Sequence, residues 1–249
     1  MIKLISVELR RAVDEFRFYW INVLSEIAVT YIFFIGLFYS YYINADSPSY
    51  FLIIALLIWL YAQEAMNQMC HYVLEEKYFG TIEQLFMSNY RPTAILGARV
   101  ISSFLITTIT AVPLGFLMYM SAGFPQSEFH AIILLPFFLT LIPLYGFGYM
   151  LAGLTLRYSN VSSVGSVLTY VLLIFSGIFP IQIPMEKLAY LMNPIGFGIK
   201  TIESFSLEGF SWFPIGVLAL QGLIFMGTGL LVFNLSVYFA RKSGVIKKY

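Results

Sequence analysis

The chain has 249 residues, of which 59% are hydrophobic and only 11% are charged, and its formal net charge is +1. A soluble domain carries about 25% charged residues, so this chain has too little polar surface to be a water-soluble globule, and most of it must be surrounded by lipid. The small net charge argues against nucleic acid as a partner. The single cysteine, Cys70, excludes an internal disulfide. It forms no metal site with His71, because adjacent helical residues point about 100° apart and no further ligand cluster is present.

The N-terminal segment, Met1–Arg17, is charged but periodic. One helical face is apolar and the remaining faces carry the charges; the apolar residues are Ile2, Ile5, Leu9, Val13 and Phe16. This pattern predicts a helix that lies in the plane of the membrane surface, although an ordinary charged tail is the alternative. The apolar run that follows is too long for a signal peptide and lacks a small-residue cleavage site, so we expect it to remain as a membrane anchor.

Six apolar runs are long enough to cross a bilayer, which requires about 20 residues each. They are Phe18–Ile43, Tyr50–His71, Leu96–Ala122, Ala131–Leu156, Val161–Ile181 and Phe213–Ala240. We therefore expect an all-α integral membrane protein that forms a single domain over residues 1–249.

The distribution of Lys and Arg predicts the orientation of these spans. With the N-terminus in the cytoplasm, the outer side carries only Lys187 and Lys200, and the other basic residues all fall on the inner side. Because an even number of spans returns the chain to the same side, both termini are expected in the cytoplasm of a multi-pass protein of the cell membrane.

The inner connection between the second and third spans, residues 76–91, has more structure than a loop requires. The chain breaks at Gly80, and Thr81 can then cap a short helix on which Ile82, Leu85 and Phe86 share one face. A short amphipathic helix on the inner surface is a feature that a soluble partner can bind. The alternative is a surface-lying connector without a partner.

Two carboxylates fall inside predicted spans. Glu64 lies in the inner half of the second span, near Asn67, and Glu26 lies about one-third of the way along the first span. A carboxylate in lipid is costly, so both should face protein or water. Glu64, Asn67 and Glu26 are therefore candidates for the translocation path or for a dimer contact. For Glu26 the alternative is a residue of the inner interface near Arg17 or Arg99.

Three motifs resemble those of type-2 ABC exporter permeases. The first, Glu76-Lys77-x-x-Gly80-Thr81-x-Glu83-x-Leu85, is similar to the E-[KR]-x-x-G-T-x-E segment that follows the second span of that family. The second consists of Phe175–Pro180, Ile183-Pro184 and Leu191–Pro194, which resemble the family's outer re-entrant segment. The third, Leu154–Asn160, is similar to its short inner connection between spans four and five. The motifs occur in the family's order and at its spacing.

The resemblance implies a set of partners. In this family two permeases, identical or homologous, pair in the membrane, and each docks on a cytoplasmic ATPase subunit through the short helix after the second span. The implied coupling residues are Glu76, Lys77, Gly80, Thr81 and Glu83, with Leu85, Phe86 and Met87 as an apolar contact face and Arg91 as a neighbour. The implied outer re-entrant segment covers residues 182–212, and the residues that mark it are Pro180, Pro184, Asn193 and Pro194.

The chain has no ATP site of its own. Its nearest P-loop lookalike begins at Gly222, lacks the phosphate-binding lysine and lies inside a span. We therefore expect no catalytic residues and no bound cofactor, with ATP and Mg²⁺ held by the partner ATPase.

Two other functions are alternatives. A self-sufficient secondary transporter or channel could use Glu64 and Glu26 as coupling sites, but no inverted repeat is visible. An intramembrane protease could use Glu75 and Glu76, but Gly80 stands where the arginine of that motif is required. The cargo expected of an exporter is an amphipathic drug or peptide, because the spans offer aromatic and methionine surface and few charges.

Overall fold

The computed structural model describes residues 2–44, 51–122, 133–158, 161–176, 192–207 and 209–243. In these ranges the chain is helical and forms no strand, which confirms the expected all-α class. The helices are α1 (Ile2–Phe18), α2 (Trp20–Asn44), α3 (Phe51–Tyr78), α4 (Ile82–Met87), α5 (Pro92–Ala122), α6 (Leu134–Arg157), α7 (Ser162–Ile174), α9 (Pro194–Leu207) and α10 (Trp212–Ser243).

Within the described ranges, five helices are long and apolar enough to cross a membrane, namely α2, α3, α5, α6 and α10. The helix α7, with 13 residues, is shorter. It covers the first part of the expected span Val161–Ile181, whose last residues lie outside the described ranges, so the count of six spans stays a prediction. The first third of the expected outer segment 182–212, residues 182–191, also lies outside the described ranges, as does residue 208.

The second span is longer than its hydropathy predicts. We expected it to end at His71, but α3 continues to Tyr78 and contains 28 residues. Its length is therefore about 42 Å, compared with about 30 Å for the hydrocarbon layer. The inner end of α3 thus extends beyond the membrane, where helix formation does not depend on apolar side chains.

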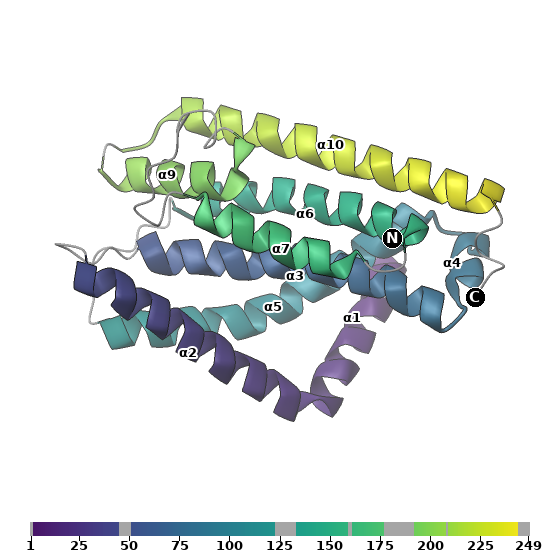
Figure 1. Ribbon diagram of the computed structural model, residues 1–249, viewed down its shortest axis with the longest axis horizontal. Coiled ribbons are helices and arrows are strands. Elements are labelled where there is room, and N and C mark those ends of the chain that lie inside the picture. Colours follow the sequence, from purple (N-terminus) through teal and green to yellow (C-terminus); the bar gives the residue numbers. More distant parts are fainter. Residues whose placement is uncertain are drawn as a thin grey trace.

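The helix α3 is at the centre of the bundle and packs against α5, α6, α7 and α9 (Figure 1). In the apolar window of α3, 61% of the residues are buried, whereas the figure for α2 is 6%. The helix α2 is anchored mainly through Phe34, which is fully buried in a cluster with Leu56 and Trp59 of α3. This central position explains how α3 can carry polar residues at membrane depth.

The most extensive helix pairing joins α6 to α10, which run side by side (Figure 1). Glycine makes this close approach possible at Gly146, where an added Cβ would lie 2.5 Å from the backbone carbonyl carbon of Phe225. Small residues at a helix crossing let two backbones approach closely in a membrane.

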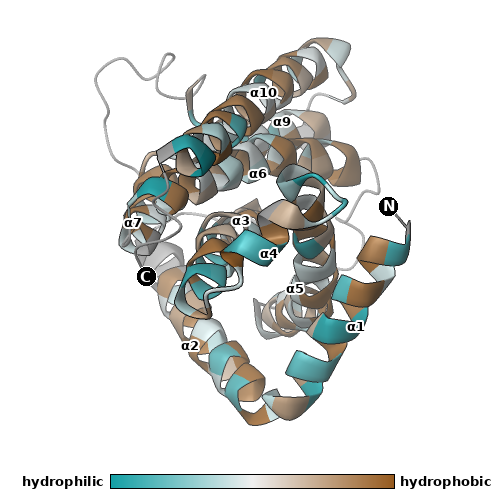
Figure 2. Ribbon diagram, turned by 90° about the vertical axis from the view of Figure 1, so that its right-hand side faces the viewer, coloured by the Kyte–Doolittle hydropathy of each residue, from teal (hydrophilic) through white to brown (hydrophobic). Residues whose placement is uncertain are grey.

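The helix α1 runs across the long axis of the bundle and packs beside α5 (Figure 2). Its expected amphipathic character is present: Leu4, Ile5, Leu9 and Phe16 are half-buried, whereas Lys3 and Arg10 are exposed. The apolar face of α1 therefore contacts the bundle itself. Its position in the plane of the membrane surface stays a prediction.

Candidate functional site

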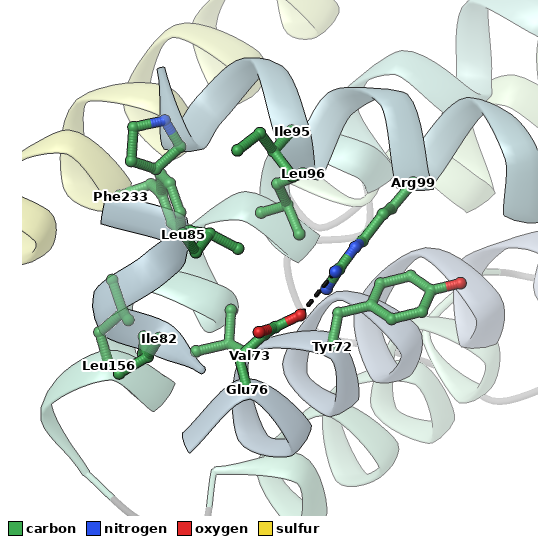
Figure 3. Close-up of a pocket in the computed structure, with 11 residues that line it drawn as sticks. Tyr72, Val73, Glu76, Ile82, Leu85, Ile95, Leu96, Arg99, Leu156 and Phe233 are labelled. Atoms are coloured by element: carbon green, nitrogen blue, oxygen red, sulfur yellow. Dashed lines mark hydrogen bonds and ion pairs between the residues drawn. The ribbon is translucent and has the colours of Figure 1, made fainter. Parts of the chain in front are cut away.

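At the inner end of the bundle, one arginine links three helices. Arg99 of α5 is 8% exposed. Its Nη2 lies 2.5 Å from Oε1 of Glu76 on α3, and its Nε lies 3.4 Å from Oε2 of Glu8 on α1. The ring of Tyr72 lies beside the guanidinium, with its centroid 5.5 Å from Cζ (Figure 3). Two carboxylates thus share one largely buried cation.

Gly80 makes the turn between α3 and α4. Its φ is +68°, in the left-handed region that a side chain makes costly. The backbone N–H groups that follow the helix donate to its last carbonyls, Gly80 N to Lys77 O at 3.2 Å and Thr81 N to Glu76 O at 3.0 Å. This is the usual way in which a glycine ends a helix, and it confirms the predicted break.

The prediction that the side chain of Thr81 caps α4 is wrong. Thr81 occupies the N-cap position but makes no side-chain capping hydrogen bond. Its hydroxyl instead donates to the carboxylate of Glu76. The turn at Gly80 brings Thr81 back over the end of α3, where a charged acceptor makes a stronger hydrogen bond than a cap. Glu76 therefore receives both Arg99 and Thr81.

Lys77 joins the end of α3 to the end of α6. Its Nζ donates to the carbonyl of Thr155 at 3.0 Å and to that of Leu156 at 3.4 Å. These carbonyls belong to the last turn of α6, where a cation satisfies unpaired acceptors and favours the helix dipole. Together with Arg99, Lys77 makes the inner end of the bundle one connected unit.

One face of α4 packs against the bundle and the opposite face is exposed. Ile82 is buried and Leu85 half-buried, and both line a cavity of about 20 Å³ whose wall includes Leu156 and Phe233 (Figure 3); this is room for about one water molecule. Leu85 thus faces the chain's own core. The exposed face of α4 carries Glu83 and Met87, and Met87 is 75% exposed.

Several residues here were not predicted as part of the site. Tyr78 and Phe79, next to Gly80, are large side chains that are 79% and 78% exposed. Arg99 and Glu8 were missed as well, although an arginine within an apolar run was a signal that carboxylates must lie near it. Arg91 is exposed, and its carbonyl accepts the N–H of Ala94 at 2.8 Å at the start of α5. The side chain of Phe86 lies outside the description.

The polar candidates at membrane depth differ in their hydrogen-bond partners. Glu64 accepts a hydrogen bond from the hydroxyl of Ser103 on α5. Asn67 points to another neighbour, because its Oδ1 accepts from the hydroxyl of Ser166 on α7 at 3.2 Å. Glu26 is exposed on α2. In the part of the chain that the structure describes, it forms no ion pair with Arg17 or Arg99.

At the opposite end of the bundle, Asn193 joins α7 to α9. It is 4% exposed; its Nδ2 donates to Leu172 O at 2.7 Å, and its Oδ1 accepts from the N–H of Ile195 at 3.1 Å. Asn193 therefore caps α9, which begins at Pro194, a residue suited to the first helical position. Pro180 and Pro184 lie outside the described residues. In the described ranges, no group of three His, Cys, Asp or Glu side chains could hold a metal ion.

Comparison with known proteins gives one result that covers most of the chain. A family model described as ABC-2 type transporter matches residues 4–207. This range extends from α1 to α9 and includes Arg99, α4 and the turn at Gly80. A search of the curated proteins found no match.

Proposed function

The chain belongs to the ABC-2 type transporter family, and from that membership we propose that it is the permease subunit of an ATP-driven exporter. The family and the five apolar helices establish a multi-pass membrane transporter permease. The proposal adds a separate ATPase, present in two copies and holding ATP and Mg²⁺, and a second permease, identical or homologous.

The observation that carries the proposal is the division of α4 into two faces. Ile82 is buried against the bundle, while Glu83 and Met87 are exposed. A six-residue helix is not stable alone, so α4 depends on its attachment to the bundle. Because only one face is used for this attachment, the other face is available to a partner. We add the exposed side chains beside the turn at Gly80 to this surface and name the set the docking face: Tyr78, Phe79, Glu83 and Met87.

Contacts between α4 and the rest of the bundle would transmit a displacement of the docking face to the membrane helices. A push on α4 reaches α3 through the turn at Gly80. The end of α3 is tied to α1 and α5 through Arg99, and to the end of α6 through Lys77. Closure of the ATPase subunits would then move these helices together, as a rigid-body displacement rather than a local rearrangement.

Direction and cargo follow from the same proposal. We place both termini and the docking face in the cytoplasm of a cell with this chain in its plasma membrane, because the basic residues gather on that side. Transport is outward, and the cargo is an amphipathic drug or peptide that the aromatic and methionine side chains of the spans can accommodate.

The test is co-purification from the native membrane. The tagged chain should retain a P-loop ATPase, and Glu83→Lys should remove it by reversing the charge at the docking face. Glu203→Lys is the matched control, because Glu203 is exposed on α9 at the opposite end of the bundle. Gly80→Leu should also weaken the association, and Gly80→Asn should preserve more of it, since asparagine tolerates a positive φ.

Retention of the ATPase by both Glu83→Lys and Gly80→Leu would remove α4 from the interface. A wild-type chain that purifies alone, and moves solutes in liposomes without ATP, would contradict the exporter proposal. That result would favour secondary transport with Glu64 and Glu26 as coupling sites.

A further inference from the structure

Three basic residues of α1 lie on one line along the helix. Lys3, Arg10 and Arg17 are seven residues apart, a spacing at which a helix drifts by only about 20°. Successive members are therefore about 10.5 Å apart along the axis, and the line is about 21 Å long. All three are exposed. We call them the basic stripe.

The basic stripe faces away from the bundle. The side of α1 that packs beside α5 includes the half-buried residues Ile5, Glu8, Ala12 and Phe16. At 100° per residue, Arg10 lies about 160° around the helix from Ala12. Since α5 is beside α1 when the molecule is viewed along its long axis (Figure 2), the stripe points sideways, towards the surroundings of the protein.

The members of the stripe form no ion pair within the described chain. The ion pairs that α1 makes there are Arg11 with Glu15, Arg11 with Glu75, and Glu8 with Arg99. None includes a member of the stripe. Asp14 is the one carboxylate of α1 beside the stripe, which leaves three positive charges against one negative charge on this side of the helix.

The stripe lies next to one end of a helix that is long and apolar enough to cross the membrane, which is where lipid headgroups are expected. The apolar window of α2 begins at Trp20, one helical turn after Arg17. Phe18, Tyr19 and Trp20 are 78%, 54% and 54% exposed, as aromatic residues at a membrane–water interface are. Because α1 runs obliquely across the bundle axis and not along it (Figure 1), the depth changes along α1 by less than the length of the helix.

From these observations we propose that the basic stripe of α1 binds the headgroups of anionic phospholipids. A line of cations at headgroup depth, pointing into the surrounding lipid, is complementary to a surface of phosphate groups with net negative charge. The interaction requires no ATPase and is independent of the exporter proposal. Since Glu8 on the same helix holds Arg99, the lipid composition would act on a helix that is joined to α3 and α5.

The test identifies the lipid next to the stripe by measuring how strongly brominated lipids quench tryptophan fluorescence. The chain has three tryptophans, and Trp59→Phe with Trp212→Phe leaves Trp20 as the only one. The protein is reconstituted with brominated phosphatidylglycerol or brominated phosphatidylcholine, which differ in headgroup charge. Trp20 should show a preference for the anionic lipid of about fivefold per net positive charge at low salt. High salt should reduce this preference, because it screens exposed charges.

Matched variants assign the preference to the stripe. Replacing Lys3, Arg10 and Arg17 together by Gln should bring the ratio to within about twofold of parity, a loss consistent with the same per-charge scale. The exchange Lys3→Arg, Arg10→Lys and Arg17→Lys keeps the charge and should keep the ratio. Arg157→Gln removes an exposed positive charge at the end of α6 and should leave it unchanged.

Equal quenching by the two lipids in the wild-type background, or an unchanged ratio in the triple Gln variant, would overturn the proposal. An unchanged ratio together with loss of a co-purifying protein would show instead that the stripe is a protein docking surface. Trp59 is 4% exposed, so its replacement can affect folding. In that case the retained phospholipids of the detergent-purified protein, with all tryptophans present, give the second measurement: the triple Gln variant should retain less anionic lipid, and equal retention would overturn the proposal.

Discussion

The shared ion pair of Arg99 predicts a large and unequal cost of mutation. Arg99→Gln leaves the carboxylates of Glu8 and Glu76 together, with side chains only 13% and 16% exposed. Removing one partner of a buried pair costs about 3–5 kcal/mol. We expect about 3 kcal/mol here, at the lower end, because both carboxylates keep some contact with water.

The chain contains its own probe for this measurement. Its single cysteine, Cys70, is buried, so a thiol-reactive fluorophore reports unfolding of the detergent-purified protein. A double-mutant cycle of Arg99→Gln and Glu76→Gln should give a coupling energy above about 1.5 kcal/mol, within the range for residues in one ion-pair network. Arg11→Gln is the control, because Arg11 and Glu75 are 3.8 Å apart and about half exposed; it should change stability by less than about 1 kcal/mol.

A coupling energy below about 0.5 kcal/mol would be typical of a screened surface pair. That value would refute the argument that Arg99 holds α1, α3 and α5 together. Equal effects of Arg99→Gln and Arg11→Gln would refute it as well.

Two further predictions use the same thiol probe. Gly146→Ala should destabilise the protein by about 1–3 kcal/mol, because the new methyl group meets the backbone of α10. The control Gly227→Ala should be neutral or slightly stabilising, because no atom lies within 4 Å of its added Cβ. Equal effects of the two variants would show that α6 and α10 can separate. Asn193→Ala should lower the free energy of unfolding by about 2–4 kcal/mol, since it removes a helix cap and leaves the buried carbonyl of Leu172 without its donor. A decrease below about 0.5 kcal/mol would contradict a role of Asn193 in joining α7 to α9.

The sequence predicts the five long helices of the described ranges well, because each contains an apolar run that is long enough to cross a bilayer. It also predicts the break at Gly80, because a glycine between two helical patterns has few other roles. The end of α3 was placed too early at His71, since hydropathy measures where lipid ends and not where the helix ends. The extra turns of α3 carry Glu76 and Lys77, so this difference bears directly on the candidate site.

The contacts within the site could not be predicted in the same way. Arg99 binds Glu8, which is 91 residues away in the sequence, and local sequence patterns do not predict contacts between residues so far apart. On α4 the sequence indicates apolar residues but not which of them the bundle covers, so Leu85 and Met87 looked equivalent. The acceptor for Thr81 was missed because capping rules treat a helix start in isolation, whereas the turn at Gly80 returns Thr81 to the end of the preceding helix.

The length of α3 has a mechanical consequence. The helix is unbroken from Phe51 to Tyr78, so it behaves as a stiff rod that would move together with the helices tied to its inner end. A tilt of about 5° around its midpoint moves each end by about 2 Å, in opposite directions, for a rod of about 42 Å. A small displacement at Gly80 would thereby appear on the far side of the membrane without any helix melting or any peptide changing its conformation.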